Sequence, residues 1–147
     1  MRVGEVCTRE VVFCDSNATV AQIAQLMREH HVGDLIIARP QGEKLQPVGI
    51  VTDRDLVIRV LADDRRAGPS SAGELMSSPL VQISEDEIVY EAIRRMRVYG
   101  VRRLPVVDAN GFLVGMLTLD DVVEYLAEEL TQLARIVPGQ TILKAPG

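Results

Sequence analysis

The stretch GIVTDRD at residues 49–55 occurs a second time, as GMLTLDD, at residues 115–121. Both stretches place a threonine three residues before an aspartate. The similarity extends upstream, because the apolar pattern of residues 20–37 returns at residues 89–106. The shift between the copies is 69 residues upstream and 66 at the motif, so the first copy carries three extra residues in between. A shift that stays constant over long stretches indicates duplication, which predicts two similar units with two equivalent clefts.

The composition predicts one compact body built from both copies. With 147 residues and 47% hydrophobic content, the chain can bury about one ordinary core, so the two units are expected to pack together. The net charge of −5, spread along the chain, argues against nucleic-acid partners and against an anionic membrane surface. No apolar run approaches the roughly 20 residues of a membrane span, and the N-terminus has no apolar signal core. We therefore expect a cytoplasmic protein.

Cysteine and histidine give weak signals. Cys7 and Cys14 lack a C-x-x-C or histidine-rich spacing, so reduced, partly buried thiols are favoured over a redox pair or metal ligands, and no metal site is expected. His30 and His31 follow a predicted helix, where a cation is favoured. We interpret them as helix-end residues in preference to ligands or a catalytic base.

Each copy predicts the order strand, helix, strand, strand, helix, which gives an α+β fold with two pseudo-symmetric units. The helical spacing of apolar residues predicts first helices beginning near residues 20 and 89. Their caps are expected at residues 15–17 in the first copy and, as a capping box, at residues 84–87 in the second. The remaining expected elements are opening strands at residues 10–14 and 79–83, hairpins with turns at residues 41–42 and 110–111, and closing helices at residues 56–62 and 122–133.

The domain boundaries follow from the repeat and from the glycine and proline between the copies. The first unit is expected at residues 1–64, the linker at 65–71, the second unit at 72–130 and a C-terminal tail at 131–147.

The two units resemble a tandem pair of cystathionine-β-synthase (CBS) domains, also called a Bateman module, of the stand-alone bacterial or archaeal type. The segments that carry the resemblance are VGDLIIA and VRRLPVV after the first helices, and GIVTDRD and GMLTLDD before the second. The resemblance covers residues 3–130. It implies binding of an adenosine-containing ligand such as AMP, ADP, ATP, S-adenosylmethionine or NAD, as a regulatory ligand and not as a required cofactor. It also implies regulation of a partner protein, whose identity the sequence does not give.

The repeated motif supplies the first candidate ligand contacts. A carboxylate accepts both protons of vicinal ribose hydroxyls, so Asp55 and Asp121 are candidates for ribose contacts. Thr52 and Thr118 precede the closing helices, and the resemblance implies contacts on the phosphate side. A Thr-x-x-Asp sequence at a helix start is also typical of a capping box, and both interpretations can hold together.

Arg102 and Arg103 form the second candidate set. Guanidinium groups suit phosphate oxygens, and the resemblance implies basic residues at this place, although two solvated surface arginines remain an alternative. The aligned residues of the first copy are Gly33 and Asp34, and an acid there repels phosphate. We therefore predict tighter binding at the cleft of Thr118 and Asp121 than at the cleft of Thr52 and Asp55.

The adenine ring needs an apolar slot, and an aromatic content of 3% leaves aliphatic side chains to form it. The resemblance implies that each slot comes from the opposite copy. Val11 and Val12 would then serve the cleft of Asp121, and Leu80 and Val81 the cleft of Asp55. Simple core positions are the alternative for all four residues.

Two hypotheses about function follow. The first is a sensor that binds an adenosine nucleotide and changes a surface read by a partner protein. The second is a ligand-free scaffold for oligomerisation or protein interaction. An enzyme is disfavoured because no nucleophile, base and orienting group are recognisable together. The long apolar stripe of the last predicted helix further predicts a homodimer, with residues 125–136 in the contact.

Overall fold

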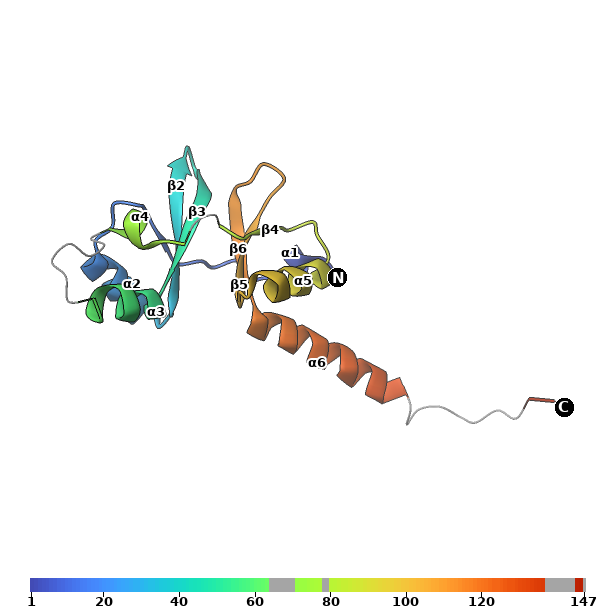
Figure 1. Cartoon of the computed structure of the whole chain (residues 1–147). Helices are drawn as coiled ribbons and strands as arrows, with labels where there is room; N and C mark the ends of the chain where they lie inside the picture. Colours follow the sequence, from blue (N-terminus) through green and yellow to red (C-terminus); the bar gives the residue numbers. More distant parts are fainter. Residues whose placement is uncertain (64–70, 78–79, 137–144, 147) are drawn as a thin grey trace.

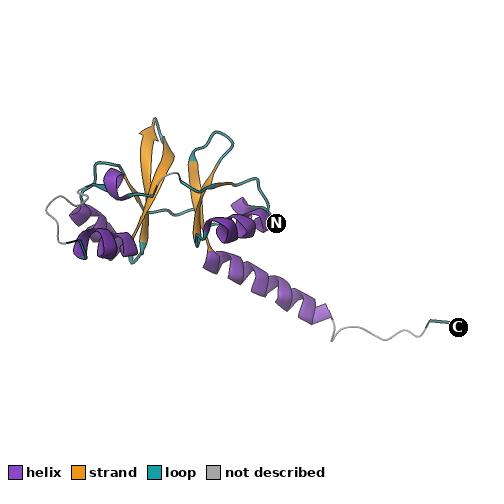
Figure 2. Ribbon diagram, in the orientation of Figure 1, coloured by secondary structure: helices purple, strands orange, loops and turns teal. Residues whose placement is uncertain are grey.

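The computed structural model describes residues 1–63, 71–77, 80–136 and 145–146. Two three-stranded sheets lie next to each other, with the helices on their outer sides (Figures 1 and 2). This arrangement confirms the predicted α+β class. No helix in the described ranges is both long and apolar enough to cross a membrane.

The first sheet has the strand order β1-β2-β3 and the second β4-β5-β6. In each sheet the opening strand is parallel to the middle strand, and the last two strands form an antiparallel hairpin. The elements of the first half are α1 (Val3–Val6), β1 (Phe13–Cys14), α2 (Val20–His30), β2 (Asp34–Gln41), β3 (Lys44–Thr52), α3 (Asp53–Leu56) and the π-helical turn η1 (Val57–Leu61). The elements of the second half are α4 (Ala72–Leu75), β4 (Ile83–Ser84), α5 (Val89–Tyr99), β5 (Arg103–Val107), β6 (Leu113–Thr118) and α6 (Leu119–Ile136).

The two hairpins confirm the prediction from the turn sequences. Gly42 (φ 64°) and Gly111 (φ 85°) adopt the left-handed conformation that glycine tolerates best. In the second turn, Asp108 Oδ1 accepts hydrogen bonds from the backbone N–H groups of Asn110 (2.9 Å) and Phe112 (3.0 Å). The Phe112 bond in particular lowers the pKa of Asp108.

The expected starts near residues 20 and 89 are confirmed, but the expected caps need correction. Thr19, and not residues 15–17, caps α2, through a capping box with Gln22. In the second copy, Glu87 Oε2 accepts from the backbone N–H of Ser84 (3.0 Å), but α5 begins only at Val89. The reason is that the segment before α5 pairs with the N-terminus of the chain: Glu87 O accepts from the backbone N–H of Val3 at 2.8 Å.

Other predicted bounds also shift. The opening strands are shorter than predicted, and part of the predicted linker and Pro79 fall outside the described residues. The first closing helix begins at Asp53 and continues as a π-helical turn, whereas the second runs from Leu119 to Ile136. The second closing helix therefore extends to residue 136, beyond its predicted end at residue 133, into the segment that the sequence analysis assigned to the tail.

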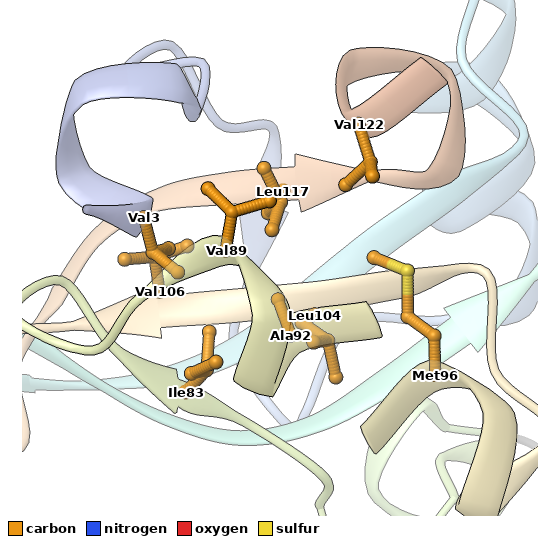
Figure 3. Close-up of a cluster of buried hydrophobic side chains, with 9 residues drawn as sticks. All are labelled: Val3, Ile83, Val89, Ala92, Met96, Leu104, Val106, Leu117 and Val122. Carbon is orange, nitrogen blue, oxygen red and sulfur yellow. The ribbon is translucent and has the colours of Figure 1, made fainter. Parts of the chain in front are cut away.

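The short helices α1 and α4 each pack in the unit formed by the other sequence copy. Val3 of α1 lies in the core of the second unit, which Figure 3 shows together with Ile83, Leu104, Leu117 and others. The complete set in that cluster is Val3, Ile83, Val89, Ala92, Met96, Leu104, Val106, Leu117 and Val122. Conversely, Ala72 and Leu75 of α4 complete the core of the first unit. Neither sequence copy therefore completes its core alone.

Contacts between the sheets fix the relation of the two units. Ile36, Ala38 and Met116 form a small buried cluster that spans both. Thr8 and Met116 exchange two backbone hydrogen bonds of 2.9 Å. Gly115 is required at this approach because a Cβ there would lie 2.7 Å from Thr8 O. This close packing positions the clefts between the units.

Candidate functional site

Two clefts lie between the units, one beside each repeated threonine. The Thr52 cleft has a volume of about 490 Å³, and the Thr118 cleft about 250 Å³. The Thr52 cleft is lined by Gly33, Asp34, Ile50, Thr52, Asp53, Arg54, Ser77, Leu80, Val81, Gly100, Val101, Arg102, Arg103 and Pro105. The Thr118 cleft is lined by Thr8, Glu10, Val11, Val12, His31, Val32, Gly33, Asp34, Arg103, Met116 and Thr118. Only the first volume falls within the range of about 300–1,000 Å³ usual for small-molecule sites.

The two Thr-x-x-Asp motifs form matching capping boxes. The backbone N–H of Asp55 donates to Thr52 Oγ1 (3.2 Å), and the backbone N–H of Thr52 donates to Asp55 Oδ2 (2.9 Å). The bonds between Asp121 and Thr118 have the same pattern, at 3.1 and 3.0 Å. The capping interpretation of the motif is therefore confirmed. The ribose contacts stay a prediction.

The capping geometry affects what each side chain can offer a ligand. Thr52 and Thr118 line their clefts, whereas neither Asp55 nor Asp121 belongs to the described lining. Each threonine oxygen accepts from a backbone amide, which leaves its hydroxyl proton to donate. Each carboxylate uses Oδ2 in its box, which leaves Oδ1 as a second acceptor.

One of the two arginines, Arg102, does not lie where the sequence analysis placed it. We expected Arg102 and Arg103 to serve the cleft of Thr118, because they belong to the same copy. Arg102 instead lines the Thr52 cleft, and Arg103 lines both clefts. Each cleft is built from both units, so the cations of the second copy reach across to the threonine of the first. The charge argument for ranking the Thr118 cleft first is therefore removed.

Asp34 meets Arg103 at the boundary between the clefts. The Oδ2 atom of Asp34 is buried and forms an ion pair with Nε of Arg103. The acid that we expected to repel phosphate in the first copy is thus balanced by an arginine of the second copy. An isolated acid at a buried position would be costly, and pairing with Arg103 offsets part of that cost.

The apolar residues follow the expected crossed arrangement. Leu80 and Val81 of the second copy line the Thr52 cleft, together with Ile50 of the first. Val11 and Val12 of the first copy line the Thr118 cleft. All four of the predicted residues are partly buried, which suits a wall that a flat ring can contact. Their role in adenine binding stays a prediction.

Sequence reasoning missed several residues of the clefts. Asp53 and Ser77 line the Thr52 cleft, while Glu10 and His31 line the Thr118 cleft. His31 ends α2 in the left-handed conformation, so the helix-end interpretation holds, but its position also faces a cleft. The repeat in the sequence could have indicated this position of His31, because His31 aligns with Gly100. Gly100 ends α5 in the same conformation and lines the other cleft.

A third depression, of about 610 Å³, lies on the outer side of the first unit between α2 and the sheet. Its described lining includes Asp15 and Glu29 but no lysine or arginine. It therefore does not suit a phosphorylated ligand.

Among the described residues, no group of His, Cys, Asp and Glu side chains could hold a metal ion, so neither thiol belongs to such a group. Burial is the largest cause that raises the pKa of both Cys7 and Cys14. A raised thiol pKa lowers the thiolate fraction at neutral pH, so neither thiol is activated as a nucleophile.

Comparison with known proteins agrees with this geometry. The family model of the CBS domain matches twice, at residues 3–62 and 72–128. An uncharacterized protein of Methanopyrus kandleri is 41% identical over 122 residues, which are 83% of this chain and 61% of that protein. The chain therefore spans less than two thirds of this relative's length.

Two solved structures share the fold and contain nucleotides. A CBS domain protein of Pyrobaculum aerophilum, complexed with AMP, is 28% identical with a TM-score of 0.71, covering 87% of this chain and 99% of that one. The CBS domain of a bacterial CNNM/CorC family Mg²⁺ transporter, in complex with ATP, is 25% identical with a TM-score of 0.71, covering 84% and 85%.

Proposed function

We propose that this chain, which belongs to the CBS domain family, is a regulatory module that binds an adenosine nucleotide in the Thr52 cleft and signals to a partner protein. The observation that carries the proposal is the composition of that cleft. It brings together an apolar wall, a threonine hydroxyl and the side chain of Arg102 within about 490 Å³. The AMP and ATP complexes of similar structures support the ligand class.

The cleft offers a separate partner for each part of the ligand. Leu80, Val81 and Ile50 provide aliphatic contacts for the adenine ring. Asp55 does not belong to the described lining, but its capping box holds it next to Thr52, and its Oδ1 accepts from ribose hydroxyls. Arg102 supplies a guanidinium group for phosphate oxygens. One ligand thus touches side chains of both units.

Contacts with both units give the ligand a way to regulate. A ligand shifts an equilibrium only by its differential affinity for two conformations. Because the cleft walls come from different units, closing the units around a ligand changes the contacts that the ligand makes. We propose that the partner protein recognises the closed arrangement.

The scaffold hypothesis keeps one specific observation in its favour. The outer part of α6 exposes Leu126, Leu130 and Leu133, which the core of the chain does not use. An exposed stripe of this kind marks an interaction surface. It is compatible with ligand binding and concerns a different part of the molecule.

Calorimetry with adenosine and AMP tests the proposed site through Arg102→Ala. We expect the variant to lose roughly 10- to 100-fold in affinity for AMP, because a hydrogen bond to a charged group is worth about 1.5–3 kcal/mol. Adenosine lacks the phosphate and should bind with nearly unchanged affinity.

Arg97→Ala is the matched control, because Arg97 is an exposed arginine on α5 outside both clefts. It removes the same charge and should leave AMP binding unchanged. Absence of any heat with adenosine, AMP, ADP, ATP, NAD and S-adenosylmethionine would contradict the sensor function altogether.

A further inference from the structure

Asp34 and Arg103 occupy equivalent positions in the two units. Asp34 is the first residue of β2 and pairs in register with Thr52. Arg103 is the first residue of β5 and pairs in register with Thr118. Each hairpin therefore places one member of the ion pair directly beside its cleft threonine.

The ion pair is the physical boundary shared by both clefts. Asp34, Arg103 and Gly33 are the described residues that line the Thr52 cleft and the Thr118 cleft alike. The side chain of Asp34 is 12% exposed and that of Arg103 is 42% exposed. A change in this pair is felt in both clefts at once, because Coulomb interactions are strong at short range and the carboxylate of Asp34 is largely shielded from water.

The charges that face the two clefts are unequal. In the Thr52 cleft, Arg54, Arg102 and Arg103 face Asp34 and Asp53. In the Thr118 cleft, the cation is Arg103, the acids are Glu10 and Asp34, and His31 is the further titratable group. An anionic ligand is therefore favoured in the Thr52 cleft and opposed in the Thr118 cleft.

We propose that Asp34 is an internal anion that competes with a ligand phosphate for Arg103, so that the two clefts cannot both hold a phosphorylated ligand. This inference rests on the proposed function and names its regulation. When a phosphate in the Thr52 cleft attracts Arg103, Asp34 loses its counter-charge. Glu10 and the released Asp34 then repel a second phosphate from the Thr118 cleft. Asp34 is a specificity-determining residue that makes binding of anions anticooperative.

The ion pair of Asp34 and Arg103 also sets how much a phosphate group adds to the affinity of a ligand. A phosphate gains Arg103 only by displacing the carboxylate of Asp34, whereas a ligand without phosphate leaves the pair intact. The ratio of the affinities for AMP and adenosine therefore measures the competition. A merely structural ion pair would change the affinities for both ligands together.

The test compares Asp34→Asn with Glu43→Gln in calorimetric titrations with adenosine and with AMP. Glu43 is an exposed acid in the turn of the same hairpin, so its substitution makes the same change in net charge away from both clefts. We expect Asp34→Asn to raise the AMP affinity about tenfold while the adenosine affinity changes less than twofold. The stoichiometry for AMP should rise from one to two per chain. Glu43→Gln should behave as the wild type.

Two results would overturn the inference. One is an unchanged ratio of AMP to adenosine affinity in Asp34→Asn whose thermal melt shows a folded protein. The other is wild-type protein that binds two AMP molecules per chain with equal affinity, a measurement that does not depend on any variant.

Inorganic pyrophosphate separates this inference from the proposed function. If no adenosine ligand binds but Asp34→Asn gains stabilisation by pyrophosphate relative to Glu43→Gln, the charge competition stands and the adenosine function fails. If neither probe binds any variant, both are overturned.

Discussion

The carboxylates of Asp55 and Asp121 show how one residue can serve the fold and a ligand. Each accepts the backbone N–H of its motif threonine and so holds the start of the closing helix. The same bond fixes the orientation of the carboxylate, which leaves the other oxygen at a defined place. A preorganised acceptor of this kind binds without further loss of side-chain entropy.

Asp55→Ala and Asp121→Ala form a matched pair of variants. Both lose a capping box, so each should lower the free energy of unfolding by about 1 kcal/mol in a denaturant titration. Only Asp55→Ala should also weaken adenosine binding, by on the order of 2–3 kcal/mol, because its cleft is the larger one. A greater loss of binding in Asp121→Ala would show that the Thr118 cleft, and not the Thr52 cleft, binds adenosine more tightly.

Gly115→Ala should destabilise the fold by about 1–3 kcal/mol, as measured by chemical unfolding. The added Cβ would lie 2.7 Å from the backbone oxygen of Thr8, which is held in two hydrogen bonds with Met116 and cannot easily move. Gly33→Ala is the control, because its nearest atom, at 3.0 Å, is the end of the exposed Asp53 side chain. Equal effects of the two substitutions would contradict the close approach.

The thiols give a pH dependence with a defined sign. Because burial raises the pKa of Cys7 and Cys14 above the ordinary 9.0, the folded state binds their protons more tightly than the unfolded state. This contribution to stability is present below pH 9.0 and is lost as the pH rises through the folded pKa. The free energy of unfolding should therefore fall above pH 9 less steeply in the Cys7→Ala, Cys14→Ala variant. If the free energy of unfolding fell with pH equally steeply in the wild type and the variant, the thiols would make no such contribution to stability.

At the scale of elements, local signals were sufficient for the hairpins and the middle of the helices. The turn at Asn110 and Gly111 needs only neighbouring residues, because Asp108 and a left-handed glycine close it. The start of α5 near residue 89 was predicted, but its cap was wrong: Glu87 accepts from the backbone N–H of Ser84, yet the helix begins only at Val89. The deciding contact there is the pairing of Glu87 with Val3, 84 residues away, which no local pattern encodes.

The site shows the same division between local and distant information. Thr52 and Thr118, with their caps, could be recognised from spacing alone. The cleft that Arg102 lines could not be recognised in this way, because it depends on how the two copies pack. Asp34 aligned with Arg103 in the repeat, which indicated equivalent positions but not that the two side chains meet.

At the scale of the whole molecule, α1 and α4 tie the halves together. Val3 completes the second core and Leu75 the first, so separating the halves would expose both. Opening and closing of the clefts must therefore occur without separating the units. This restriction favours small changes in the relation of the two sheets, which a ligand that contacts both can bias.

The packing of the two units does not account for most of the apolar residues of helix α6. Val122 is buried in the second core and Tyr125 packs against it, but the C-terminal part of the helix projects away from both sheets (Figure 1). Its exposed apolar residues are Val123, Leu126, Leu130, Leu133 and Ile136, and Leu130 is 67% exposed. They follow helical spacing and so lie along one face. We propose that the same face of a second copy covers them.

Substitution of Leu126 and Leu130 by glutamate should therefore convert a dimer into a monomer. Light scattering should give a wild-type mass near twice the 16.2 kDa of one chain at micromolar concentration, and about half of that for the variant. Glu124→Gln together with Glu128→Gln is the control on the polar face of α6, and it should remain dimeric. The variant should still melt cooperatively, because neither leucine belongs to the two cores. A wild-type mass near 16.2 kDa across a hundredfold range of concentration would show that another partner, or solvent, covers this face.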